Sequence, residues 1–251
     1  MAGALGRDAR PGHEDRPATP ALHGSPSPGL RPDRPALSSG PDPSPSDRLS
    51  HPPSWGLDTP PDEPLPLFAT WMERAASTVS FPRAVTLSTA SPSGVVSART
   101  VLLKEHDGRQ LVFESESYSR KGVELAANPW CAMTIYWREV HRQICVTGRA
   151  APLPAEVSDE MWARRGRPNQ AASLASREGE PIPSAAAELA LHAAADALAA
   201  GTAPLERPPT YEAYGLHPAT VEFWEGSADR LHRRVFYELQ PSGWTWRRIQ
   251  P

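Results

Sequence analysis

Two lysines are the most selective signal in this chain, because every other basic side chain apart from histidine is an arginine. Lysine and arginine together number 26, and only Lys104 and Lys121 are lysines. Lysine is a compact point charge, whereas arginine is a planar fork, and the two do not replace each other freely at a shaped site. We therefore consider Lys104 and Lys121 candidate ligands for an anion, although survival by chance on a solvated surface would give the same count.

Further cations accompany the two lysines. Arg99 and Lys104 lie on one predicted strand, and Arg120 and Lys121 begin a predicted helix. The free N–H groups and the positive dipole at a helix N-terminus attract anions, and the Ser115 hydroxyl adds a donor. Cations combined with a helix N-terminus are a common way to hold a phosphate. The alternative is that these charges are simply solvated at strand ends.

A second group of polar residues lies near the C-terminus. Arg230, His232 and Arg234 recur at every second position, so on a strand they would share one face. Trp224 precedes them and would suit an aromatic ligand. The alternative is an edge strand whose charges resist aggregation.

The elements that would position these residues are mostly short strands. Alternation and turn residues predict strands at 84–90, 95–104, 110–115, 130–137, 142–150, 221–224, 233–239 and 244–249. Helices are predicted at 64–77, 118–127, 154–165 and 184–200. Hairpins dominate and no βαβ alternation is visible. The chain is therefore predicted to be mainly β, an antiparallel barrel with peripheral helices.

The first part of the chain has a different composition. Residues 1–54 contain no Phe, Tyr, Trp, Val or Ile and are rich in Pro, Ser, Gly, Asp and Arg. Such a segment cannot bury enough apolar surface to offset its ordering entropy. Residues 1–62 are predicted to be a disordered Pro-rich tail without a secretory signal, either a solvated extension or a transit-like or partner-binding segment. Residues 63–251 suit one domain.

Composition also limits the functions to consider. No apolar run approaches the roughly 20 residues that span a membrane. The net charge of −3 gives no overall case for nucleic acid. Cys131 and Cys145 are predicted to be free thiols of a cytoplasmic protein. The eight histidines show no paired ligand spacing, so no metal site is predicted.

A series of short motifs follows in a fixed order. They are Arg-Thr-Val-Leu-Leu-Lys (99–104), Ser-Arg-Lys-Gly-x-Glu-Leu (119–125), Asn-Pro (128–129), Tyr-Trp (136–137), Arg-Gln-x-x-Val-x-Gly (142–148), Glu-Phe-Trp (222–224) and Arg-Leu-His-x-Arg (230–234). The ordered set resembles the pyridoxamine 5′-phosphate oxidase family of FMN split-barrel proteins. The resemblance extends over about 82–251 and is weakest across 171–206.

The resemblance implies an FMN-binding split β-barrel that forms a homodimer with FMN at the interface. The implied activity is oxidation of pyridoxamine or pyridoxine 5′-phosphate by O2, giving pyridoxal 5′-phosphate and H2O2. The positions that match FMN contacts are Arg99, Thr100, Val101, Leu102, Lys104, Glu114, Ser115, Arg120, Lys121, Gln143, Trp224 and Arg234. The positions that match substrate contacts are Lys104, Arg165, Asn169, Arg230 and His232, of which Arg230 and His232 are the implied catalytic residues.

Several positions depart from the family pattern. Met161 stands where a Tyr hydroxyl is usual, and Asn169 stands where a Ser is usual. Glu114 replaces a Tyr or Phe, and Glu178 replaces a Gln expected near FMN. FMN binding is still expected, whereas the donors for a substrate phosphate are altered.

Other features resemble the phenazine-biosynthesis oxidases of the same family. They are Asn-Pro-Trp (128–130), Tyr-Trp-Arg-Glu (136–139), Trp162 and the ending Arg-Arg-Ile-Gln-Pro. An alternative function is therefore oxidation of a small aromatic substrate of another kind, a reduced tricyclic carboxylate without a phosphate. Retention of Lys104 counts against this alternative. A third possibility is a flavin-binding split barrel without turnover.

Overall fold

The structure is a computed structural model, and it describes residues 54–251. The strands are β1 (Ala84–Ala90), β2 (Val96–His106), β3 (Leu111–Glu116), β4 (Trp130–Trp137), β5 (Arg142–Pro152), β6 (Tyr211–Glu225), β7 (Arg233–Gln240) and β8 (Gly243–Arg248). The helices are α1 (Pro64–Ala76), α2 (Arg120–Ala127), the 3-10 turn η1 (Arg138–Val140), α3 (Ala155–Arg164), α4 (Arg167–Ala175) and α5 (Ala185–Ala200).

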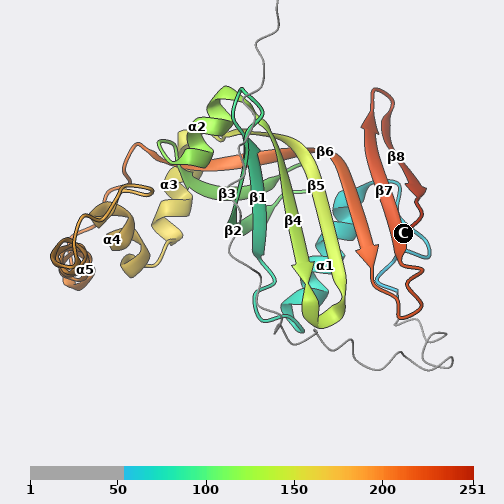
Figure 1. Cartoon of the computed structure of the whole chain (residues 1–251), viewed down its shortest axis with the longest axis horizontal. Helices are drawn as coiled ribbons and strands as arrows, with labels where there is room; N and C mark the ends of the chain where they lie inside the picture. The colour runs from blue at the N-terminus through green and yellow to red at the C-terminus, as the bar shows by residue number, and fades with distance from the viewer. Residues whose placement is uncertain (1–53) are drawn as a thin grey trace, which may run out of the picture. The chain divides into compact units, whose positions relative to one another are not determined.

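The eight strands found within residues 54–251 form one antiparallel sheet in the order β3-β2-β1-β4-β5-β6-β7-β8. An additional pairing of β3 with β6 closes the first six strands into a barrel. The strands β7 and β8 continue the sheet beyond the barrel, next to the marked C-terminus in Figure 1. The predicted antiparallel barrel with peripheral helices is confirmed.

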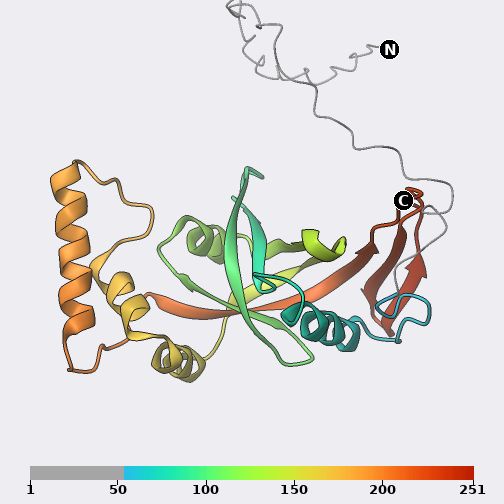
Figure 2. The same cartoon turned by 90° about the horizontal axis from the view of Figure 1, so that it is seen from below.

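The long strand β6 belongs to both parts of the sheet. Its first residues pair with β3 and its last residues pair with β7, while β5 accompanies it along most of its length. Figure 2 shows β6 running from the α3–α5 side to β7 and β8. The β5–β6 register shifts between Thr147 and Gly148. A Cβ on Gly148 would lie 2.1 Å from the His217 carbonyl oxygen, so only glycine permits this close approach.

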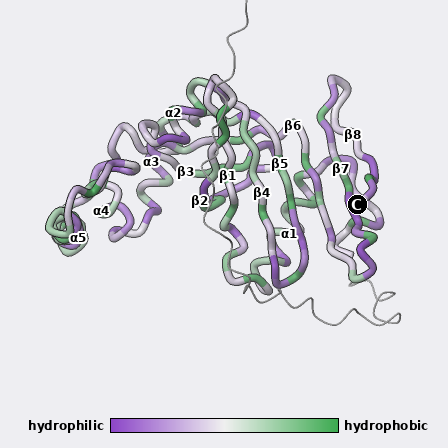
Figure 3. The backbone as a smooth tube through the Cα atoms, viewed as in Figure 1, coloured by the Kyte–Doolittle hydropathy of each residue, from purple (hydrophilic) through white to green (hydrophobic). Residues whose placement is uncertain are grey.

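Helix α1 packs its apolar stripe against the barrel. Pro64 occupies the first helical turn, where its missing N–H is not needed. Phe68, Trp71 and Met72 are buried, and the ring centroids of Trp71 and Phe223 lie 5.1 Å apart. Figure 3 shows hydrophobic residues spread over α1 and the barrel strands, with hydrophilic residues along the end of β8. The main core cluster therefore joins residues of α1 with residues of the barrel strands.

The packed part of the chain begins earlier than predicted. Leu57 is 1% exposed and belongs to the core, and the Trp55 N–H donates to a Glu225 carboxylate oxygen at 2.7 Å. The Trp71 indole N–H donates to the Trp55 carbonyl at 2.7 Å. Residues 54–62 were placed in the tail because Pro and Asp are frequent there, and tertiary contacts override that composition. The rest of the predicted tail, 1–53, lies outside the described residues.

Removing residues 1–62 is expected to destabilise the domain far more than removing 1–53. The longer deletion eliminates Leu57 from the core, and loss of one buried leucine side chain costs about 2–5 kcal/mol. Thermal melting of the two truncated proteins would measure the difference. Equal melting temperatures would show that the 54–62 segment contributes nothing to stability.

Three helices gather on one side of the barrel, next to the start of β6 (Figure 1). Helices α3 and α5 were predicted, whereas α4 was not. Pro168 lies in the first turn of α4, where proline is compatible with a helix. Within 54–251 the longest helix, α5, has 16 residues, and no helix is both long and apolar enough to cross a membrane.

Candidate active site

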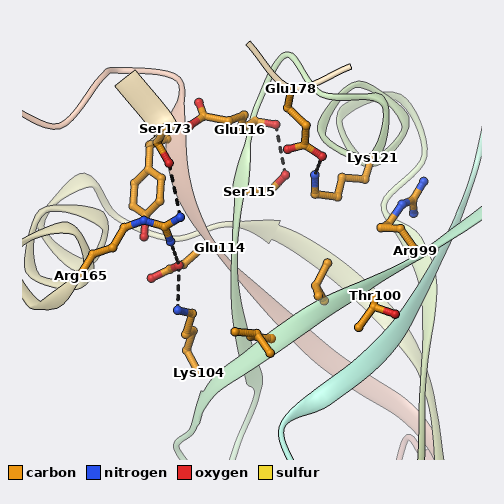
Figure 4. Close-up of a pocket in the computed structure, with 13 residues that line it drawn as sticks. Arg99, Thr100, Lys104, Glu114, Ser115, Glu116, Lys121, Arg165, Ser173 and Glu178 are labelled. Atoms are coloured by element: carbon orange, nitrogen blue, oxygen red, sulfur yellow. Dashed lines mark hydrogen bonds and ion pairs between the residues drawn. The ribbon is translucent and has the colours of Figure 1, made fainter. Parts of the chain in front are cut away.

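A cavity of about 330 Å³ lies between the barrel and the helices α2 and α4 (Figure 4). It collects predicted residues from several elements. The residues that line it are Arg99, Thr100, Val101, Leu102, Lys104, Glu114, Ser115, Glu116, Lys121, Arg165, Ser173, Glu178 and Tyr211. Both lysines of the chain therefore face one cavity, together with two arginines.

The N-terminus of α2 forms one end of this cavity. Ser119 caps the helix by accepting from the Gly122 N–H at 3.4 Å. Its hydroxyl lies 3.1 Å from the Ser115 hydroxyl and 3.1 Å from Lys121 Nζ. Although lysine is rarely buried, the Lys121 side chain is only 6% exposed. A buried ammonium, two hydroxyls and a helix N-terminus form a set of donors that fits a phosphate.

A carboxylate already engages this buried lysine. Glu178 Oε1 lies 2.5 Å from Lys121 Nζ, and the Glu178 side chain is half exposed. The Glu178 N–H donates to the Tyr118 hydroxyl at 3.3 Å, and the Arg177 guanidinium lies 4.3 Å from the Tyr118 ring centroid. Any anion that binds Lys121 therefore competes with Glu178 for the same ammonium.

Arg99 is fixed by the neighbouring strands. Its guanidinium donates to the Leu87 carbonyl at 3.1 Å and to the Thr89 hydroxyl at 2.7 Å. Glu124 of α2 lies 3.6 Å from Arg99 and 2.9 Å from Arg120. Arg120 is 65% exposed, bonds to Glu124 and does not line the cavity, so the structure does not bring it to the predicted phosphate site.

The ion pairs around Glu124 are accompanied by a large pKa shift. Desolvation acts to raise the pKa of this carboxyl, but hydrogen bonds from Ser97, Thr89 and Arg120 outweigh it and lower the pKa to about 2. Glu124 therefore remains ionised throughout the neutral range and holds α2 against β1 and β2.

At the other end of the cavity, Glu114 holds two cations. Its Oε2 lies 3.0 Å from Lys104 Nζ and 2.7 Å from an Arg165 guanidinium nitrogen. Arg165, which follows α3, also donates to the Ser173 hydroxyl of α4 at 3.3 Å. Figure 4 shows these residues facing one another. The structure thus brings together Lys104 and Arg165, and it adds a carboxylate between them.

The two altered substrate positions differ in location. Met161 is buried, packs with Val112 and Ala213, and lines a smaller adjoining cavity with Lys104 and Arg165. Asn169 does not line either cavity. Helix α4 presents Ser173 there instead, which the sequence analysis missed together with the helix. Met161 has no hydrogen-bond donor.

The C-terminal group lies elsewhere on the chain. The Trp224 and His232 rings are 4.8 Å apart, and His232 Nδ1 accepts from the Ser227 N–H at 3.0 Å. Arg234 Nε lies 2.8 Å from Glu222. The prediction that Arg230, His232 and Arg234 share one strand face is wrong. Strand β7 begins only at Arg233, and Arg230 lies in a turn with a φ of +67°.

In one chain, the two groups of predicted residues do not share a cavity. Gln143, whose amide lies 3.3 Å from Cys145 Sγ, pairs across the sheet with Trp224. Neither residue lines the cavity that contains Lys104 and Lys121. Arg230, His232 and Arg234 are absent from that cavity as well. A site containing all of them would need a second copy of the chain.

Sequence reasoning missed two further lining residues, Glu116 and Tyr211. Tyr211 is 2% exposed and starts the first half of β6, which was not predicted because Gly215 and Pro218 interrupt its pattern. Arg165 Nε is buried without a hydrogen-bond partner. Burial, followed by a hydrogen bond to Glu114 and by the charge of that carboxylate, raises the pKa of Tyr211, which keeps its hydroxyl protonated.

Glu116 should make the domain less stable as the pH rises. Burial raises the pKa of Glu116 above its ordinary value of 4.5, and its Oε1 is buried without a hydrogen-bond partner. A raised carboxyl pKa disfavours ionisation in the folded state, so stability is complete below pH 4.5 and falls above it. Glu116→Gln should therefore raise the free energy of unfolding by about 1 kcal/mol at pH 7.5 and have little effect at pH 4. Denaturant unfolding at both pH values would measure this, and an equal effect at both would contradict it.

Two further observations concern the cysteines and the residues that could bind a metal ion. Cys131 and Cys145 are free thiols, and burial raises the pKa of Cys131 to about 12. Among residues 54–251, no three His, Cys, Asp or Glu side chains lie close enough together to hold a metal ion.

Comparison with known proteins identifies the family. A family model described as pyridoxamine 5′-phosphate oxidase matches residues 72–225. The chain belongs to this family. A second model, described as the C-terminal dimerisation region of pyridoxine 5′-phosphate oxidase, matches residues 211–251. Family members bind FMN, and this chain is accordingly an FMN-dependent oxidoreductase of the pyridoxamine 5′-phosphate oxidase family.

Individual relatives fall into two groups. A dihydrophenazinedicarboxylate synthase from Burkholderia lata is 40% identical over 195 residues, which is 77% of this chain and 91% of that protein. A pyridoxine/pyridoxamine 5′-phosphate oxidase from Rubrobacter xylanophilus is 40% identical over 190 residues, or 75% and 87%. The crystal structure of PhzG from Burkholderia lata with tetrahydrophenazine-1-carboxylic acid has a TM-score of 0.74 at 38% identity, covering 78% of this chain and 96% of that one.

Proposed function

We propose that this chain is an FMN-dependent oxidase of a reduced aromatic substrate that carries a carboxylate and no phosphate. The observation that carries the proposal is the altered substrate end of the cavity. Met161 has no donor there and Asn169 does not reach it, so two groups expected on a substrate phosphate are missing. The similarity to PhzG, whose crystal structure contains tetrahydrophenazine-1-carboxylic acid, supports the same substrate class.

The residues of the cavity fit FMN. Lys121, Ser115, Ser119 and the α2 N-terminus would hold its phosphate, because they combine a buried cation with convergent donors. The strand residues 99–102 would lie along the flavin, and Arg99 is already fixed for that role by Leu87 and Thr89. When bound, FMN would supply the redox chemistry, taking two electrons and two protons in all from the substrate and delivering them to O2 to give H2O2.

The chain's own residues would orient the substrate. Lys104 and Arg165 lie together at the end of the cavity opposite Lys121 and would attract an anionic group of the substrate. Arg230 and His232 would approach from a second copy of the chain, since they do not line this cavity in their own chain. The match of residues 211–251 to a dimerisation region supports a homodimer with the site at its interface.

A second candidate substrate is pyridoxamine or pyridoxine 5′-phosphate. The observation in its favour is that Lys104 and Arg165, the two cations expected on a substrate phosphate, both line the cavity. Several relatives are named for that activity at similar identity. A shared requirement for FMN and O2 means that only the substrate distinguishes the two candidates.

Mixing two inactive variants would test the composite site. Arg165→Ala disables the cavity of the chain that carries it. Arg230→Ala leaves the cavity of its own chain intact but removes the arginine that this chain would contribute to the cavity of its partner. A dimer of one variant with the other has one intact site, so random mixing should restore about a quarter of wild-type activity. Activity no greater than that of either variant alone would contradict a site shared between two chains.

Oxygen uptake with a panel of substrates would test the substrate class. A reduced phenazine carboxylate is expected to be consumed, whereas pyridoxamine and pyridoxine 5′-phosphate are expected to react slowly and with a high KM. Because the remaining phosphate contacts are charged groups, any such turnover should weaken further at high salt. Tight and salt-insensitive turnover of pyridoxamine 5′-phosphate would favour the second candidate.

A further inference from the structure

Glu114 occupies the centre of the subsite that would receive the anionic group of the substrate. A single carboxylate oxygen, Oε2, contacts both Lys104 Nζ at 3.0 Å and an Arg165 guanidinium nitrogen at 2.7 Å. The three side chains come from β3, β2 and the end of α3, so the contact joins three separate elements. The Glu114 side chain is 9% exposed, which limits screening by solvent.

The charge of this subsite depends on Glu114. Lys104 and Arg165 carry two positive charges, and Glu114 removes one of them. A phosphate monoester approaches two negative charges above pH 6, whereas a carboxylate carries one. A carboxylate therefore balances the three side chains, whereas a phosphate leaves one excess negative charge close to Glu114.

We propose that Glu114 selects the charge of the substrate, admitting a carboxylate monoanion and disfavouring a phosphate dianion at the Lys104–Arg165 subsite. The proposal rests on the proposed function and deepens it, because it names the residue that sets the substrate class. It gives a function to Glu114, which is otherwise only a departure from the family's sequence pattern.

Binding of two ring-matched probes to the FMN-loaded protein tests this proposal. The probes are 1-naphthoate and 1-naphthyl phosphate, measured by perturbation of the flavin spectrum at pH 8, where the phosphate is dianionic. Glu114→Gln should lower Kd at least about tenfold for the phosphate and at most about threefold for the carboxylate, because the repulsion removed scales with ligand charge.

Three further variants keep the result interpretable. Glu105→Gln removes one charge from the same region, but Glu105 pairs with exposed Arg164, so the ratio of the two Kd values should stay at its wild-type value. Glu114→Asp keeps the charge and should also keep the ratio. Glu114→Ala provides a second charge-removing variant if the glutamine protein fails to fold, and it should move the ratio in the same direction.

Two outcomes would overturn the proposal. One is an equal change in both Kd values in the charge-removing variants, and the other is an unchanged Kd for 1-naphthyl phosphate. Failure of the proposed function would look different, because it would appear as turnover of a B6 phosphate by the wild-type protein. The binding ratio does not depend on turnover, so the two failures are distinguishable.

Discussion

Replacing Lys121 with alanine is expected to weaken FMN binding by roughly ten- to a hundredfold in Kd, or about 1.5–3 kcal/mol. Lys121 is the buried cation of the proposed phosphate subsite, and its Nζ contacts Ser119 at the start of α2. A charge-assisted contact in a buried site is about twice as strong as a neutral one, which sets this magnitude. Fluorescence titration of the flavin-free protein with FMN would measure the change.

Two variants provide matched comparisons for Lys121→Ala. Arg120→Ala removes a neighbouring cation that bonds to Glu124 outside the cavity, so its effect on Kd should be much smaller. Glu178→Gln removes the carboxylate that competes for Lys121, so it should tighten FMN binding. An unchanged Kd for Lys121→Ala, or equal losses for Lys121 and Arg120, would contradict the assignment of the phosphate subsite.

Replacing Glu225 with glutamine is expected to destabilise the protein by about 3–5 kcal/mol. Glu225 is 1% exposed and lies 3.2 Å from Arg142 Nε, which is 2% exposed. The same carboxylate lies 3.5 Å from Arg233 and accepts from the Trp55 N–H. Loss of the charge leaves a buried guanidinium without its counter-ion and weakens the attachment of the 54–62 segment.

Denaturant unfolding would measure this cost. Glu238→Gln is a suitable control, because Glu238 pairs with Arg247 at the surface and exposed pairs contribute at most about 1 kcal/mol. The double replacement Arg142→Met with Glu225→Leu should be less destabilising than Glu225→Gln, since it removes both charges together. A loss below 1 kcal/mol for Glu225→Gln would show that this buried network is not important for stability.

Local sequence patterns were sufficient for most of the barrel. Alternating residues predicted β1 with the bounds observed, and the helix predicted at 118–127 ends at Ala127 as expected. The first half of β6 was missed because Gly215 and Pro218 are unusual in strands. A Cβ on Gly215 would lie 2.1 Å from the Gln110 side-chain oxygen, so this glycine serves a close approach that only the folded chain reveals.

The candidate site was less accessible to sequence reasoning. The cations Arg99, Lys104, Lys121 and Arg165 were predicted, and they do line one cavity. Their ion pairs with Glu114 and Glu178 join residues that are 10, 51 and 57 positions apart in the sequence, and no local sequence pattern predicts such contacts. The C-terminal residues were expected on a strand face because spacing alone does not show where a turn ends and a strand begins.

Anaerobic reduction of the flavin is the most direct test of the proposed function. The FMN-loaded wild-type protein should lose its flavin absorbance on mixing with a reduced phenazine carboxylate, and regain it when O2 is admitted. Pyridoxamine 5′-phosphate at the same concentration should bleach it far more slowly. Rapid bleaching by pyridoxamine 5′-phosphate, with none by the phenazine carboxylate, would contradict the account of the substrate site.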